Sequence, residues 1–270
     1  MTPAPFNASK IQAGDASVSV HTAGSGQPLV LCHSLLADRT SFDRVAPALA
    51  SHFQVIALDL PGFGASPAVM GGLVAVADRV AAVVRALELR ERPIMLGNGY
   101  GGFVTLQAAI RHPDIAQRLV LADCGACFSE TGRAAFRGMA AKAQEGGLAA
   151  VADVAMRRLF APEYQGQHPE LIAQRKERFL ALDPGTFLEA CEALATLDLR
   201  PELASVQVPA LVLVGAMDEA TPPQMSHELA AGLPQAQLAI LPGCAHVPQL
   251  QEPEQFLAAI SEFIGLPRAA

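Results

Sequence analysis

An aspartate and a histidine in the last quarter of the chain have the types and setting of a catalytic acid–base pair. Asp218 lies in GAMDEATPP and His246 lies in GCAHVPQL, and each follows a short apolar run. A carboxylate that accepts a hydrogen bond from an imidazole orients the ring, so that its other nitrogen can remove a proton from a nucleophile or a water molecule. These two residues are therefore candidates for general acid–base chemistry.

Six short, unbroken apolar runs must position this pair. Such runs are typical of strands in a parallel sheet that is covered on both faces. The segments between them, for example residues 75–89, repeat apolar residues at helical spacing. Alternation of strand and helix predicts an α/β fold whose ligands bind beyond the carboxyl ends of the strands. The expected strands are Leu29–Cys32, Val55–Leu58, Ile94–Leu96, Leu119–Ala122, Leu211–Val214 and Leu238–Leu241.

One segment interrupts the alternation. Residues 125–200 show helical patterns but no convincing strand. We therefore expect a helical lid inserted after the sixth strand. Residues 1–124 and 201–270 then form the core.

The order of these motifs resembles the α/β-hydrolase superfamily over nearly the whole chain. LVLCHSLLADRTSF is similar to that family's third strand and oxyanion loop, and LGNGYGG falls at its nucleophile elbow. LVLVGAMDEATPP resembles the strand that carries the acid, and GCAHVPQLQEPEQF resembles the loop that carries the histidine. The resemblance implies an α/β-hydrolase fold with Asp218 as acid and His246 as base. It also implies an oxyanion hole formed by the backbone N–H groups of Leu35 and Tyr100.

The elbow departs from the family's G-x-S-x-G pattern. Gly97 and Gly101 occupy the framing positions, and the residue between them is Gly99, which has no side chain to attack a substrate. Loss of a triad nucleophile costs about 10⁶-fold in turnover. We expect hydrolysis of a small enol-lactone, ester or C–C bond by a water that His246 activates in the space left at Gly99. A lyase or isomerase that uses the same pair, an inactive ligand-binding relic and an engineered variant without nucleophile remain alternatives.

Two subfamilies share motifs with this chain. The run D-x-A-T-P-P, the A-H loop and the E-P-E-x-F tail are similar to 3-oxoadipate enol-lactonases, which also carry a serine at the position of Ser34. PGFGAS and Asn98 resemble meta-cleavage-product C–C hydrolases. Both groups act on small, often carboxylated products of ring cleavage, which implies aromatic catabolism. Arg157 and Arg158 in the expected lid are candidates to bind such a carboxylate.

Other polar residues at the strand ends are candidates to support the site. His33 is expected to orient the oxyanion loop through hydrogen bonds, and Ser34 and Asn98 flank the reacting groups. Asp123 is an alternative acid, because some α/β-hydrolases place the acid after the sixth strand.

The elbow glycines also match the dinucleotide fingerprint G-x-G-x-x-G. Gly97, Gly99 and Gly102 follow an expected strand, and Asp123 ends the next one. Two strand–helix units precede this strand, however, and the motifs around Asp218 and His246 would have no role. Dinucleotide binding is therefore the weaker interpretation, and we expect no cofactor.

Cys124 and Cys127 form a C-x-x-C motif. A structural zinc site requires a second spaced pair, and a redox motif belongs near the start of a thioredoxin-like unit. We expect buried, inert thiols and no metal site, with a substitute cysteine nucleophile as an alternative.

Composition bounds the partners. The 270 residues are 51% hydrophobic and 17% charged, carry a net charge of −7 and include no Trp and only 2 Tyr. These values exclude a disordered chain and disfavour a nucleic-acid partner. The N-terminal MTPAPFNASK has no apolar leader segment, and the longest uncharged stretch contains several prolines. With an odd number of cysteines, five, we expect a cytoplasmic protein with a small-molecule substrate and no membrane partner.

Overall fold

A computed structural model describes residues 6–267 of the chain. Residues 1–5 lie outside this range. They begin the segment MTPAPFNASK, on which the expectation of no apolar leader segment depends. Across residues 6–267, none of the helices combines the length and the hydrophobicity that crossing a membrane requires.

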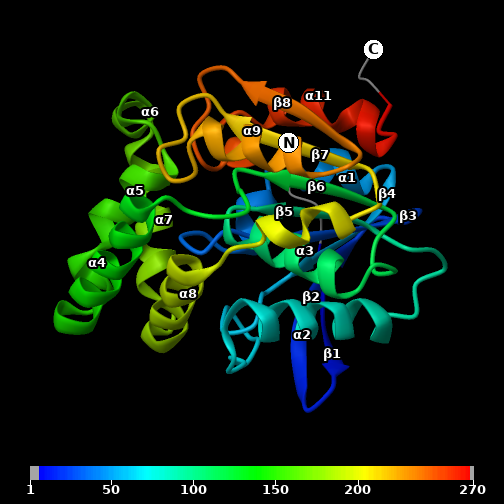
Figure 1. Cartoon of the computed structure of the whole chain (residues 1–270), viewed down its shortest axis with the longest axis horizontal. Coiled ribbons are helices and arrows are strands. Elements are labelled where there is room, and N and C mark those ends of the chain that lie inside the picture. The colour runs from blue at the N-terminus through cyan, green and yellow to red at the C-terminus, as the bar shows by residue number, and fades with distance from the viewer. Residues whose placement is uncertain (1–5, 268–270) are drawn as a thin grey trace.

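The core is an eight-stranded sheet in the order β1-β2-β4-β3-β5-β6-β7-β8 (Figure 1). Strands β3 to β8 run parallel to one another, whereas β2 is antiparallel to both of its neighbours, β1 and β4. The predicted mostly parallel sheet is confirmed, because all six expected runs are strands. The first two strands were not predicted, since β1 is largely exposed and lacks an apolar run. The strands are β1 (Asn7–Ala13), β2 (Ala16–Ala23), β3 (Gln27–Cys32), β4 (Phe53–Leu58), β5 (Ile94–Asn98), β6 (Arg118–Ala122), β7 (Ala210–Gly215) and β8 (Ala236–Leu241).

Helices cover both faces of this sheet. On β3, Leu29 and Leu31 pack in a core with Phe256 of one helical layer, whereas Val30 packs with Phe103 of the other. This alternation explains why the strands are apolar throughout. One layer consists of α1 (Ala46–Ala50) and α11 (Pro253–Ile264), and the other of α2 (Gly72–Ala86), α3 (Tyr100–Arg111) and α9 (Pro223–Gly232).

Five helices form the connection between β6 and β7 and lie together at one side of the sheet (Figure 1). In this segment α4 packs on α8, and α5 packs on α7. The side chains of Ser129 and Asp183 cap α4 and α8 by accepting backbone N–H bonds. We call residues 125–200 the helical insertion. Its helices are α4 (Glu130–Gly146), α5 (Ala152–Leu159), α6 (Pro162–Gln167), α7 (Pro169–Leu180) and α8 (Pro184–Thr196).

Candidate active site

Asp218 and His246 meet beyond the ends of β7 and β8. The Nδ1 atom of His246 lies 2.8 Å from Oδ2 of Asp218, and both residues are buried. Asp218 also accepts hydrogen bonds from the backbone N–H groups of Ala220 and Thr221, and from the Thr221 hydroxyl at 2.6 Å. Because a carboxylate only accepts, Nδ1 of the neutral imidazole carries the proton and Nε2 is free to act as a base.

The turn between β5 and α3 has the geometry of a nucleophile elbow. Gly99 has φ 55° and ψ −121°, a conformation that favours glycine. The backbones around it approach closely. A Cβ atom on Gly97 would lie 2.2 Å from the Gly101 carbonyl oxygen, and one on Gly101 would lie 2.1 Å from that of Cys32. The framing glycines are therefore required by packing.

The space beside Gly99 is taken by a serine from another loop. Ser34 lies two residues after β3, and its Oγ atom is 3.2 Å from Nε2 of His246. A Cβ atom on Gly99 would lie 2.4 Å from that Oγ atom and 2.6 Å from Nε2. The Ser34 hydroxymethyl group therefore lies where a side chain on Gly99 would point, and hydrolysis by a water that His246 activates stays a prediction.

The two residues whose amides are expected to form an oxyanion hole border the same hollow. Leu35 and Tyr100 both line it, and Tyr100 is the first residue of α3. Neither backbone N–H group donates to another protein group within residues 6–267. Amide donors without an internal partner are what a developing oxyanion requires.

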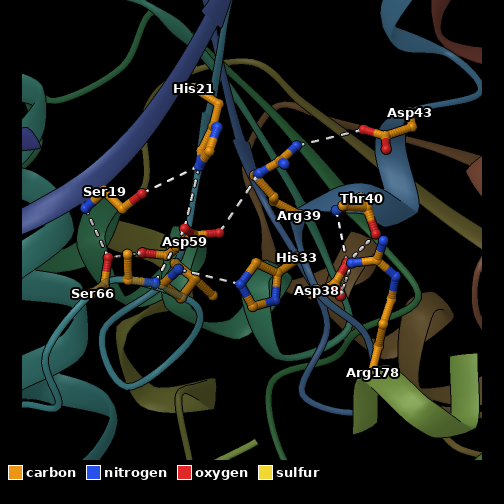
Figure 2. Close-up of polar contacts among 12 residues, drawn as sticks. Ser19, His21, His33, Asp38, Arg39, Thr40, Asp43, Asp59, Ser66 and Arg178 are labelled. Atoms are coloured by element: carbon orange, nitrogen blue, oxygen red, sulfur yellow. Dashed lines mark hydrogen bonds and ion pairs between the residues drawn. The ribbon is translucent and has the colours of Figure 1, made fainter. Parts of the chain in front are cut away.

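His33, which is labelled in Figure 2, fixes the backbone at Ser34. The Leu60 N–H group donates to Nε2 of His33 at 3.2 Å, so Nδ1 carries the ring proton and donates to the Ser34 carbonyl oxygen at 3.0 Å. Burial lowers the pKa of His33, which keeps the ring neutral at neutral pH.

Asp38 connects this loop to the helical insertion. It accepts the Thr40 N–H bond at 2.8 Å and lies 3.2 Å from Nη1 of Arg178 on α7, as Figure 2 shows. The buried Arg175, also on α7, approaches the same carboxylate to 3.5 Å. Burial alone would raise the pKa of Asp38, but the Thr40 hydroxyl and the charge of Arg175 together lower it.

Asn98, at the end of β5, holds the histidine loop. Its Nδ2 atom donates to the His246 carbonyl oxygen at 2.9 Å and to Oδ2 of Asp123 at 3.2 Å. The Gln249 side chain donates in turn to Oδ1 of Asn98 at 3.0 Å. Asn98 therefore contacts the backbone of the base rather than its ring.

Asp123 lies beside Asp218, is fully buried and accepts a hydrogen bond from the Gly215 N–H group at 2.9 Å. Burial, followed by the neighbouring charge of Asp218, raises the pKa of Asp123 well above its usual range. The acid that contacts the histidine is thus Asp218. The full burial of Asp123 also leaves no surface for a ribose, which counts against the dinucleotide interpretation.

Asp123, Asp218 and His246 are close enough to ligate a metal ion, since their candidate ligand atoms lie within 4.8 Å of one another. However, Nδ1 of His246 already donates to Asp218, and the raised pKa of Asp123 favours its protonated form, which binds cations poorly. The arrangement fits a hydrogen-bonded acid pair better than a metal centre.

The hollow over these groups is small and mostly apolar. It leaves about 20 Å³ for the centres of water molecules, which is room for roughly one water. A larger ligand therefore requires the helical insertion, or the side chains that line the hollow, to move. The apolar lining consists of Leu35, Leu36, Phe103, Phe128, Phe136 and Leu194.

The structure brings only one of the two candidate arginines to the site. Arg158 lines the hollow, lies over the Phe136 ring at 5.2 Å from its centroid and donates to the Ala220 carbonyl oxygen at 3.4 Å. Burial lowers the pKa of Arg158, although the charge of Asp218 acts in the opposite direction. Arg157 is exposed and does not line the hollow.

The two cysteines of the C-x-x-C motif and Cys32 do not line the hollow. Cys32 and Cys124 are buried, and burial raises the pKa of both thiols, that of Cys32 to about 12. Cys127 is partly exposed and accepts a hydrogen bond from Arg133. None of the three lines the hollow, so the arrangement gives no support to a cysteine nucleophile.

The sequence reasoning missed Thr221 and Gln249. Thr221 contacts both members of the pair, since its hydroxyl also lies 3.4 Å from Nδ1 of His246. The D-x-x-T spacing from Asp218 is a detectable signal, because an aspartate often accepts hydrogen bonds from residues two and three positions later. No comparable signal marks Gln249.

Comparison with known proteins agrees with this geometry. The chain is 33% identical over 260 residues to a pimeloyl-[acyl-carrier protein] methyl ester esterase of Aeromonas hydrophila, which covers 92% of this chain and 100% of the relative. The structure is similar to that of an enol-lactonase from Burkholderia xenovorans, with a TM-score of 0.88, 26% identity, and coverage of 97% of this chain and 100% of the other. It is also similar to a thermophilic esterase from Thermogutta terrifontis, with a TM-score of 0.85, 28% identity, and coverage of 96% and 98%.

The sequence profile described as the alpha/beta hydrolase fold matches residues 27–253, which include both loops of the site and the helical insertion. The sheet order and the positions of Asp218 and His246 after β7 and β8 agree with that match. This protein therefore belongs to the α/β hydrolase fold family and is a hydrolase.

Proposed function

We propose that this protein hydrolyses the ester or lactone bond of a small, carboxylated substrate, with His246 as the general base. The observation that carries the proposal is the position of His246. Its Nδ1 atom is held by Asp218 at 2.8 Å, and its Nε2 atom faces a hydroxyl group and the hollow lined by Leu35 and Tyr100.

Each part of the arrangement has a role in acyl transfer. Asp218 fixes the ring and stabilises the imidazolium that forms when Nε2 takes a proton. The N–H groups of Leu35 and Tyr100 donate to the oxygen that gains negative charge in the tetrahedral intermediate. An apolar lining strengthens these interactions, because it lowers the local dielectric constant.

The similar proteins favour ester chemistry over the alternatives. An esterase and an enol-lactonase are among them, and both ester and lactone hydrolysis proceed through a tetrahedral intermediate. C–C cleavage, and a lyase or isomerase reaction, would use the same pair but have less support. Ligand binding without turnover would leave the hydrogen-bonded base without a function.

Arg158 supports a carboxylated substrate. Arg158 is half-buried and lines the hollow, and within residues 6–267 its guanidinium group makes a single, long hydrogen bond of 3.4 Å to the Ala220 carbonyl oxygen. A substrate carboxylate would provide the short, bidentate partner that a guanidinium prefers.

The test measures hydrolysis of a monomethyl dicarboxylate ester and of the corresponding dimethyl ester by acid release. We expect His246→Ala to abolish turnover of both esters, and His227→Ala, on the exposed part of α9, to leave it unchanged. Arg158→Gln should raise KM for the charged ester about tenfold or more and spare the neutral ester, whereas Arg157→Gln should affect neither. Turnover that survives His246→Ala would refute the proposal.

A further inference from the structure

We propose that Ser34 is the nucleophile of this enzyme and that it replaces the side chain missing at Gly99. The inference rests on the proposed ester hydrolysis and names the group that attacks the substrate. It moves the nucleophile from the turn after β5 to the loop after β3.

Ser34, His246 and Asp218 form a continuous hydrogen-bonded series. Ser34 Oγ lies 3.2 Å from Nε2 of His246, and Nδ1 of the same ring lies 2.8 Å from Asp218. Since Nδ1 carries the proton, Nε2 is the acceptor and the Ser34 hydroxyl is the donor. Among residues 6–267, the hydroxyl of Ser34 has no hydrogen-bond partner apart from His246. A hydroxyl that donates to an oriented imidazole is the arrangement that activates a serine.

The Ser34 side chain coincides with the position that an elbow side chain would take. A Cβ atom on Gly99 would lie 2.4 Å from Ser34 Oγ and 2.9 Å from Ser34 Cβ, and such contacts are too short to coexist. The Ser34 side chain in its present position and a side chain at position 99 are therefore sterically linked, because one of them must shift to admit the other. One hydroxymethyl group fits beside Nε2, and the loop after β3 supplies it.

The amide donors remain suitable when the nucleophile changes loops. In an ordinary elbow, one oxyanion donor is the N–H group of the residue after the nucleophile, and the second comes from the loop after β3. Here Leu35 follows Ser34, and Tyr100 follows Gly99. Both line the hollow, and neither amide donates within the described part of the chain. Attack by Ser34 thus keeps one donor adjacent to the nucleophile and one on the opposite loop.

The proposed reaction has two balanced steps. In the first, the Ser34 hydroxyl gives its proton to Nε2 of His246 while Oγ bonds to the carbonyl carbon. The C–O bond to the alcohol then breaks, and the leaving oxygen takes the proton from His246, which leaves an acyl-Ser34 ester. In the second, water gives a proton to His246 and its oxygen bonds to the acyl carbon. Ser34 Oγ leaves and recovers that proton, so that ester and water give acid and alcohol.

The first experiment identifies the nucleophile without a substrate. The full-length protein is treated with a fluorophosphonate, which reacts with activated serines, and the modified residue is located by tandem mass spectrometry. We expect a single adduct on Ser34 that is lost in Ser34→Ala and His246→Ala. Ser41→Ala is the matched control, because Ser41 follows Ser34 in the chain, is also buried, and its hydroxyl has no hydrogen-bond partner among the described residues. It should keep the label.

No adduct on the unaltered protein, or an adduct only on another residue, would overturn the assignment. The position of the adduct is mapped on the unaltered protein, so the assignment can be tested even if Ser34→Ala fails to fold.

The second experiment separates the nucleophile from the overall function. Ser34→Ala should lower kcat for the monomethyl ester by about 10³-fold or more, while Ser41→Ala retains turnover. Turnover that needs His246 but survives Ser34→Ala would refute the role of Ser34 and leave the proposed function standing with water as the attacking group. A Ser34 adduct without hydrolysis of any ester in the panel would support the activated serine and refute the substrate class.

Discussion

The two loops that meet at His246 differ in what they provide. The turn between β5 and α3 has the backbone of a nucleophile elbow, with Gly99 at φ 55° and three further glycines that permit close approach, but it has no reactive side chain. The loop after β3 has an ordinary backbone and a buried hydroxyl 3.2 Å from the base. Backbone geometry and nucleophile, which one residue normally combines, are thus divided between two segments.

The two loops are also held in different ways. The loop after β3 is fixed by His33 and by Asp38, which pairs with Arg175 and Arg178 of the helical insertion. The turn after β5 is fixed by Asn98 and its buried partner Asp123. One anchor is a cluster of three charged groups, Asp38, Arg175 and Arg178, between the core and the insertion, and the other is a hydrogen-bonded network within the core.

The largest expected effect comes from a change at Asp218, which orients His246 whichever loop provides the nucleophile. Asp218→Asn keeps the size of the side chain but no longer fixes the proton on Nδ1, and we expect kcat to fall about 10⁴-fold whichever loop supplies the nucleophile. Steady-state hydrolysis of the monomethyl ester measures it. Asp123→Asn is the matched control and should keep most of the activity. The reverse result, with Asp123 essential and Asp218 dispensable, would show that the acid is misassigned.

The second prediction concerns moving the serine side chain from the loop after β3 to the turn after β5. Gly99→Ser alone places a Cβ atom against Ser34 and His246, and it imposes a strained φ on a residue with a side chain. We therefore expect the free energy of unfolding to fall by about 1–3 kcal/mol, and we expect turnover to fall as well. In the double variant with Ser34→Gly the collision is removed. Turnover should then exceed that of Ser34→Gly alone by about tenfold or more. Chemical denaturation and ester hydrolysis measure these effects. Improved turnover in the single variant Gly99→Ser would contradict the steric linkage.

The smallest effects are opposite pH dependences of stability. The pKa of Asp38 is lowered in the folded protein, so its contribution is present above the unfolded pKa of about 3.9 and is lost as pH falls through the folded value. The pKa of Asp123 is raised, so its contribution is full below about 3.9 and is lost as pH rises through the folded value.

Each group changes the stability by at most about 1.4 kcal/mol per pH unit. Asp38→Asn should therefore be less stable than the unaltered protein at neutral pH, and this difference in unfolding free energy should disappear on acidification. Asp123→Asn should gain stability relative to the unaltered protein as pH rises from about 4. Urea denaturation at several pH values measures both. Parallel curves for both variants would show that neither carboxyl titrates differently on folding.

Parts of this arrangement could be predicted from the sequence alone. Unbroken runs such as LVLC and LVLV reveal strands because a sheet covered on both faces admits only apolar side chains. Asp218 and His246 could be singled out because they lie three and five residues after the ends of such strands, Gly215 and Leu241. The largely exposed β1 gave no such signal. Arg157 and Arg158 could not be distinguished, since neighbours on α5 point in directions about 100° apart and only packing against Phe136 and Ala220 selects Arg158.

The chain by itself determined the α/β pattern, the glycine-rich turn and the absence of a side chain at position 99, because these depend on local residue types and spacing. From the sequence alone, Ser34 was expected only to support the site. The tertiary structure decided that Ser34 and His246, 212 positions apart, lie 3.2 Å from each other and that the serine fills the site that glycine leaves open. The physical reason is that β3 and β5 are adjacent in the sheet while the loop after β8 folds over their carboxyl ends, and no local pattern records that contact.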